Sequence, residues 1–210
     1  MGGGKGWPHS RLVAWSCSRT GCGLVIGVLV SGSGTNLQAL IDAGMPIAAV
    51  ASNVPGVCAL KRAAAADIAT GVFELESYPT RSGRDAAMAT WLSEYGARLI
   101  VCAGYMHLLT GTFLDRYPER VINVHPSLLP AFPGMHAVEQ ALEAGVAATG
   151  VTVHYVDSGI DTGQVIEQVE LPIQSGETVD ELLERVHQLE HRLLPQVARR
   201  LLEQAAGTGR

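Results

Sequence analysis

The sequence predicts an α/β fold, a three-layer sandwich whose central sheet of about seven strands is mostly parallel but mixed. Two observations lead to this prediction. From residue 24 onward, short apolar runs alternate with segments whose apolar residues recur at helical spacing. The early apolar runs are also continuous rather than alternating, which is typical of parallel strands buried on both faces. The N-terminal half is therefore expected to be Rossmann-like.

The elements of the first half follow from these runs and from the glycines that separate them. Residues 24–30 form a β-branched apolar run that ends in Ser-Gly-Ser-Gly, and Gly44 stops the helix that comes next. Further on, Ala87, Trp91 and Leu92 share one side of a helix. The expected strands are 24–30, 47–51, 72–75 and 99–103, and the expected helices are 35–43, 57–66 and 83–95.

The second half is less regular. Two apolar runs are joined by the short segment 157–163, which favours a hairpin and makes the sheet mixed. The final segment, 177–204, has apolar residues at helical spacing, and Pro195 is expected to kink it. The expected strands are 121–124, 151–156 and 164–171, and the expected helices are 136–143 and 177–204.

We expect a single domain over residues 24–210, because no linker, repeat or low-complexity run divides this range. Residues 1–23 show neither helical nor strand period. Their basic character before an apolar run superficially resembles a secretory signal, but no Ala-x-Ala-like cleavage site is present. We interpret them as a flexible N-terminal extension or as the product of a misplaced start site.

The composition argues against several classes of function. A formal net charge of -5 does not favour a broad nucleic-acid footprint. No apolar run approaches the roughly 20 residues that span a bilayer. The four cysteines include no CxxC pair, so zinc and redox motifs have little support, and Cys102 is expected to be a buried apolar residue. These features favour a cytoplasmic enzyme.

A glycine-rich segment, residues 31–36, connects the first strand to the first helix with the sequence Ser-Gly-Ser-Gly-Thr-Asn. Glycines let backbone amides point at an anion, and the helix N-terminus adds positive potential. The segment is not a Walker motif, and Leu37 replaces the third glycine of a dinucleotide fingerprint. A phosphate loop and an ordinary tight turn both remain open, although the position after a strand favours a ligand site.

The strongest chemical signal is the pair Asn123 and His125 at the end of a predicted strand, followed by the acidic loop 157–163. Residues two apart on a strand point to one face, so the amide and the imidazole project together. An amide can hold a developing oxyanion, and an imidazole tuned by a carboxylate can move a proton near neutral pH. Asp161 is the preferred carboxylate, with Asp157 as the competing acid.

Each of these residues also has a purely structural interpretation. Asn123 could cap a turn, His125 could be a satisfied core histidine, and Asp161 could be a turn residue before Gly163. Other charged and titratable residues also have a simpler interpretation. Arg81 and Arg84 are expected to form surface salt bridges, and Glu190 could be a solvated charge. His136 and His154 are expected to support the site rather than to act in catalysis.

Four motifs resemble the folate-dependent formyltransferases, and within them the phosphoribosylglycinamide formyltransferases of purine biosynthesis. They are the stretches 30–38, 103–109, 123–136 and 157–163, and the resemblance runs from about residue 24 to about residue 203. Methionyl-tRNA formyltransferase and formyltetrahydrofolate deformylase share the Asn-His-Asp set. The first carries an added C-terminal β-barrel and the second an N-terminal regulatory domain, for which we expect no room here.

The resemblance implies a role for each matching residue. It implies catalysis by Asn123, His125 and Asp161. The implied substrate-binding residues are Gly32, Ser33, Gly34, Thr35, Asn36 and Glu190. The implied folate-binding residues are Arg81, Tyr105, Met106, His107, Leu108, Leu109, Asn123, Val156, Asp157 and Asp161. One departure is His107, which stands where the family usually has arginine; a neutral imidazole cannot act as an arginine fork.

The implied reaction is formyl transfer from 10-formyltetrahydrofolate, the co-substrate, to the amine of 5-phosphoribosylglycinamide, without a metal. The expected partners are these two small molecules, with no nucleic acid and no membrane, and a homodimer stays open. Two alternatives remain: an anion-binding module that uses only the glycine-rich loop, and a deformylase in which water replaces the amine.

Overall fold

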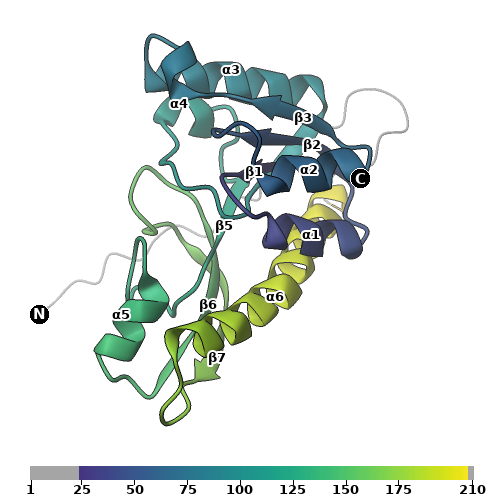
Figure 1. Cartoon of the computed structure of the whole chain (residues 1–210). Helices are drawn as coiled ribbons and strands as arrows, with labels where there is room; N and C mark the ends of the chain where they lie inside the picture. Colours follow the sequence, from purple (N-terminus) through teal and green to yellow (C-terminus); the bar gives the residue numbers. More distant parts are fainter. Residues whose placement is uncertain (1–23, 208–210) are drawn as a thin grey trace, which may run out of the picture.

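The computed structural model describes residues 24–207 and contains a seven-stranded sheet with helices on both faces (Figure 1). The strand order is β3-β2-β1-β4-β5-β6-β7. All neighbours from β3 to β5 are parallel, whereas β6 is antiparallel to both β5 and β7. This confirms the predicted mixed α/β sandwich. The predicted N-terminal extension, residues 1–23, lies outside the described residues.

The strands are β1 (Val25–Val30), β2 (Ile47–Ser52), β3 (Ala69–Val72), β4 (Ala97–Cys102), β5 (Val121–His125), β6 (Ala148–Tyr155) and β7 (Val165–Pro172). The helices are α1 (Thr35–Asp42), α2 (Cys58–Ala65), α3 (Arg81–Glu94), α4 (Gly111–Leu114), α5 (Ala137–Glu143) and α6 (Val179–Gly207), with a 3₁₀ turn, η1, at Leu75–Ser77. Pro195 lies inside α6, which continues through it. Within residues 24–207, no helix combines the length and the apolar character needed to cross a membrane.

The third strand was predicted at residues 72–75, which is three residues too far toward the C-terminus. The strand runs over Ala69–Val72, in parallel register with β2, and its Ala-Thr-Gly-Val sequence has little apolar signal. The apolar peak comes from Phe73, which follows the strand and is buried against Trp91 with ring centroids 5.6 Å apart. The apolar pattern of the sequence therefore predicted the strand around Phe73 instead of over the residues that precede Phe73.

The core has one apolar cluster on each side of the sheet. One cluster joins the sheet to α1, α2 and α6, and the other joins it to α3 and α4. From α6, Leu182, Val186 and Val197 are fully buried, as their helical spacing predicts. Cys102 is also buried, which confirms its expected role as an apolar residue. These two layers hold the carboxyl ends of β1, β4 and β5 in fixed positions.

Gly150 in β6 is a close-packing position that tests this arrangement. A Cβ at Gly150 would meet the backbone oxygen of Val169 and would lie 2.5 Å from Cδ2 of Leu128. Gly150→Ala is expected to lower the free energy of unfolding by about 1–3 kcal/mol, because a backbone carbonyl cannot move aside. Urea unfolding checks this. Gly111→Ala is the control, since a Cβ there meets nothing within 4 Å, and equal stability losses in both variants would contradict the packing argument.

Candidate active site

A cavity of about 570 Å³ opens where β4 and β5 end. Its lining comes from the segment after β4, the end of β5, the loop before α5 and the loop between β6 and β7. Four of its apolar lining residues are exposed: Met106, Leu108, Met135 and Ile160. Exposed apolar side chains around a concave polar site are typical of a pocket that binds an apolar ligand body and fixes its orientation with a few polar groups.

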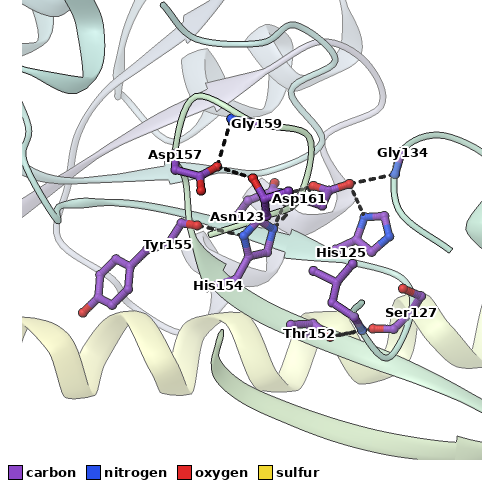
Figure 2. Close-up of polar contacts among 12 residues, drawn as sticks. Asn123, His125, Ser127, Gly134, Thr152, His154, Tyr155, Asp157, Gly159 and Asp161 are labelled. Carbon is purple, nitrogen blue, oxygen red and sulfur yellow. Dashed lines mark hydrogen bonds and ion pairs between the residues drawn. The ribbon is translucent and has the colours of Figure 1, made fainter. Parts of the chain in front are cut away.

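The structure brings Asn123, His125 and Asp161 together in this cavity (Figure 2). Asn123 Nδ2 lies 3.5 Å from Asp161 Oδ1, and His125 Nδ1 lies 3.3 Å from Asp161 Oδ2. The first two residues share one side of β5, as the period of a strand requires. The side chains of His125 and Asp161 are only 5% and 14% exposed, so solvent screens their interaction weakly.

His125 faces acceptors on both sides of its ring. Its Nε2 lies 2.8 Å from the carbonyl oxygen of Phe132, which can only accept, so this nitrogen carries a hydrogen. Its Nδ1 faces the carboxylate of Asp161. The doubly protonated imidazolium satisfies both contacts at once, whereas a neutral ring satisfies only one. The local geometry therefore suits a positively charged His125.

Asp161 is the meeting point of several donors. Its Oδ2 accepts a hydrogen bond of 2.8 Å from the backbone N–H of Gly134, and its Oδ1 lies 3.5 Å from His154 Nε2. Burial raises the pKa of Asp161, but the hydrogen bonds from His154 and Gly134, with the nearby charges of His125 and His154, outweigh burial and hold the pKa below its usual range. Asp161 is therefore a carboxylate at neutral pH.

The competing acid, Asp157, has a different environment. Its Oδ1 accepts from the backbone N–H of Gly159 at 3.0 Å (Figure 2). The same oxygen accepts from the Thr162 hydroxyl at 2.7 Å. These contacts shape the loop between β6 and β7. Asp157 also lines the cavity, but Asp161 is the acid that reaches Asn123 and His125.

The two supporting histidines differ in their contacts. His154 Nδ1 lies 2.8 Å from the carbonyl oxygen of Tyr155 and therefore carries a hydrogen. Its Nε2 lies 3.3 Å from Asn123 Nδ2 and close to Asp161, so His154 belongs to the same polar group. His136 lines the cavity, but its side chain is 70% exposed and contacts Glu139 rather than Asp161.

The glycine-rich loop lies apart from the cavity lining. Gly34 has a φ of 73° at the start of α1, and a Cβ there would lie 2.6 Å from the Cβ of Ala59, so the position requires glycine. Asn36 Nδ2 donates to Glu190 Oε2 at 2.9 Å, while the buried Asn36 Oδ1 has no protein partner. Sequence reasoning missed Arg62, whose Nε donates to the Ser33 carbonyl at 3.0 Å.

The surface interpretation of Glu190 was wrong, because only 4% of this residue is exposed. Burial raises its pKa to about 7, and the hydrogen bond from Asn36 offsets only part of that effect. The structure thus joins the glycine-rich loop to a buried carboxyl group from α6. The two residues are 154 positions apart, so residue spacing alone could not show this contact, whereas the resemblance had placed both in one substrate site.

Of the predicted folate-binding residues, those at 105–109, 123, 156, 157 and 161 line the cavity. Arg81 does not line it and is exposed at the start of α3. The expectation of a surface salt bridge at Arg84 was wrong: Arg84 and its partner Asp85 are both fully buried. Sequence reasoning missed Asp85, although the adjacent Arg-Asp pair on a helix that covers the sheet is a visible signal.

Comparison with known proteins gives a consistent family. The model of the formyl transferase family matches residues 25–198. A phosphoribosylglycinamide formyltransferase of Bacillus subtilis (strain 168) is 40% identical over 183 residues, which cover 83% of this chain and 93% of that protein. The trifunctional purine biosynthetic protein adenosine-3 of Chironomus tentans is 43% identical over 182 residues, 83% of this chain. The chain spans only 13% of that longer relative.

The same family emerges from solved structures. The crystal structure of glycinamide ribonucleotide transformylase 1 from Symbiobacterium toebii superimposes with a TM-score of 0.84 at 42% identity, covering 91% of this chain and 93% of that one. The chain therefore belongs to the formyl transferase family, and most of its length is similar in sequence and fold to the phosphoribosylglycinamide formyltransferases.

Proposed function

We propose that the chain transfers the formyl group of 10-formyltetrahydrofolate to the amine of 5-phosphoribosylglycinamide, the purine-biosynthesis step for which its relatives are named. The observation that carries this proposal is the convergence of Asn123, His125 and Asp161 on one cavity with an exposed apolar rim. An amide donor, an imidazole and a carboxylate are the groups that acyl transfer to an amine requires.

The neutral amine attacks the formyl carbon, and a new C–N bond forms as the carbonyl oxygen becomes an oxyanion. Asn123 Nδ2 has two hydrogens, and one of them remains for this oxyanion while the other faces His154 or Asp161. His125 contributes mainly its positive charge, because its two N–H groups face Phe132 and Asp161. A direct hydrogen bond from Nε2 to the oxyanion requires release of the Phe132 carbonyl.

The tetrahedral intermediate then breaks its bond to the folate nitrogen. The attacking nitrogen must lose a proton and the leaving folate nitrogen must gain one, so the reaction as a whole neither takes up nor releases a proton. Asp161, whose pKa is lowered, is ionised and can accept and pass on this proton through water. Its carboxylate also lies 3.3 Å from Nδ1 of His125, where it would balance the positive charge that the proposal assigns to that ring.

The two substrates occupy different parts of the site in this proposal. The formyl donor lies in the cavity between the wall 105–109 and the loop 156–161, where the exposed apolar side chains cover its ring system. The phosphate of the acceptor lies at the glycine-rich loop 32–36, whose Gly34 opens α1. Glu190 accepts hydrogen bonds from the ribose hydroxyls, and the Asn36 Oδ1 that has no protein partner provides a further acceptor.

The first test measures tetrahydrofolate release from 10-formyltetrahydrofolate with and without 5-phosphoribosylglycinamide. Release that depends on the amine is the expected result. Release without the amine means hydrolysis, and binding without release means an anion-binding module; either outcome contradicts the proposal.

Asn123→Ala is expected to lower kcat by roughly a hundredfold or more, because the loss of one oxyanion donor costs about 3–4 kcal/mol of barrier. Steady-state kinetics with both substrates at saturation measure the effect. A thermal unfolding curve of the variant is the control for folding. Turnover close to that of the unmodified chain would remove Asn123 from the catalytic set.

Glu190→Gln is expected to stabilise the protein at high pH. The pKa of Glu190 is raised from 4.5 to about 7, so the folded state binds more protons than the unfolded state and stability falls as the pH rises through this range. The glutamine side chain carries no charge to bury, so the variant should be more stable than the unmodified chain at pH 8, by up to about 3 kcal/mol. The difference should shrink toward zero near pH 4.5.

Urea unfolding at several pH values measures this difference, and Glu203→Gln, at an exposed position on the same helix, is the control. In kinetics, the Glu190→Gln variant should show a higher KM for 5-phosphoribosylglycinamide, about tenfold, because a charged acceptor is lost. A variant that is less stable at every pH would contradict the assigned burial of a charge.

A further inference from the structure

The helix α2 holds the glycine-rich loop from one side. The backbone N–H of Ala59 donates to the carbonyl oxygen of Gly32 at 3.1 Å, and Nε of Arg62 donates to the carbonyl oxygen of Ser33 at 3.0 Å. Gly34 lies directly against the same helix, because a Cβ at Gly34 would be 2.7 Å from Cα of Ala59. Two successive carbonyl groups of the loop therefore face α2.

These two contacts set the direction of the next two N–H groups. Both peptides are trans, and in a trans peptide the carbonyl and the N–H point to opposite sides. The N–H groups of Ser33 and Gly34 therefore point away from α2. Gly34 has a φ of 73° and a ψ of 32°, the left-handed conformation found where successive backbone N–H groups converge on an anion.

The donors at the start of α1 have no partner among residues 24–207. The backbone N–H groups of residues 33–36 make no hydrogen bond to another described residue, and the first bond of the helix runs from the N–H of Gln38 to the carbonyl of Gly34 at 2.9 Å. A helix N-terminus also carries positive potential. An anion is the ligand that these N–H groups and the helix terminus favour together.

The guanidinium of Arg62 is held in place by a second contact. Its Nη1 donates to Oε1 of Gln38 at 3.1 Å, and Nε2 of Gln38 donates to Oδ1 of Asp42 at 2.8 Å. These contacts join α2 to α1 on either side of the loop. Because the half-buried Arg62 makes two directed hydrogen bonds, it keeps the peptide between Ser33 and Gly34 from turning over.

We propose that Arg62 is a positioning residue of this anion site: its hydrogen bond to the Ser33 carbonyl keeps the Gly34 N–H directed at the phosphate of the acceptor. The identity of the acceptor rests on the proposed function, whereas the orientation of the loop toward an anion does not. Arg62 acts through the peptide, so its loss weakens the binding of a phosphate group and leaves the chemical step unchanged.

Two variants separate the hydrogen bond from the positive charge. In Arg62→Gln, the amide nitrogen stands at the place of Nε and keeps the donor, but the charge is lost. In Arg62→Met, a methyl group stands there, and both are lost. Arg62→Met is expected to raise the KM for 5-phosphoribosylglycinamide about tenfold, with kcat and the KM for 10-formyltetrahydrofolate within about twofold. Arg62→Gln should keep that KM within about threefold of the unmodified chain.

Lys61→Met is the control, because it removes the neighbouring charge of α2 at an exposed position. It should leave every KM unchanged, and thermal unfolding curves compare the folding of all three variants. Equal rises of the KM in Arg62→Gln and Arg62→Met would mean that charge acts rather than the hydrogen bond, which contradicts the positioning role.

An acceptor without the phosphate, ribosylglycinamide, identifies the group that Arg62 serves. With this probe, Arg62→Met and the unmodified chain should have the same kcat/KM. A loss as large as that seen with the phosphorylated acceptor would show that Arg62 supports the site in general, and the assignment to the phosphate would be wrong.

Inorganic phosphate tests the loop without turnover. In ¹H–¹⁵N NMR spectra of the full chain, phosphate is expected to shift the backbone amide signals of Ser33 and Gly34. Its Kd should rise about tenfold in Arg62→Met and stay unchanged in Lys61→Met. Amide signals that do not move in the unmodified chain would overturn the proposal. If formyl release does not depend on the amine, the proposed function fails instead, and the phosphate titration still decides the role of Arg62.

Discussion

The rest of the site depends on the contacts made by the carboxylate of Asp161. It contacts groups from three separate parts of the chain: the backbone N–H of Gly134, the side chains of Asn123 and His125 on β5, and the ring of His154 on β6. Asp161 itself has a φ of 52°, in the left-handed region that residues other than glycine adopt uncommonly. Because these contacts form together, the loop after β6 is fixed against β5, and removal of the carboxylate leaves several buried donors without an acceptor.

The wall 105–109, which lines the same cavity as Asp161, is held at both ends by side chains from other elements. The Ser31 hydroxyl accepts from the backbone N–H of Met106 at 2.9 Å and donates to Asn53 at 2.6 Å. At the far end, the N–H of Thr110 donates to Asp85. Ser31 also opens the glycine-rich loop, so the segment that lines the cavity and the segment that starts α1 share a hydrogen-bonded support. A rigid wall of this kind keeps a ligand in place without ordering a loop on binding.

Much of this arrangement could be predicted from the sequence, and the failures have physical causes. Continuous apolar runs identify buried strands, and the spacing of Asn123 and His125 places them on one face, so their approach to a common acid is predictable. The backbone groups of Phe132 and Gly134 leave no sequence signal, because every residue has an N–H or a carbonyl. Arg84 was misplaced because arginine is usually exposed; its neighbour Asp85 neutralises it inside the core, and only the packing of α3 on the sheet reveals this.

The two acids of the site show how the surroundings of a carboxyl group decide its charge. The Asp161 side chain is only 14% exposed, but its hydrogen bonds and the neighbouring positive charges outweigh burial, and its pKa falls. Glu190 receives one donor, from Asn36, and burial raises its pKa to about 7. Asp161 is therefore charged without a ligand, whereas Glu190 is only partly charged near neutral pH, and further donors would favour its charged form. A sugar with two hydroxyl groups supplies such donors, so binding and ionisation of Glu190 favour each other. In the proposed reaction, Asp161 is thus preorganised before a ligand binds, whereas the charge of Glu190 is completed by the hydroxyl groups of the substrate.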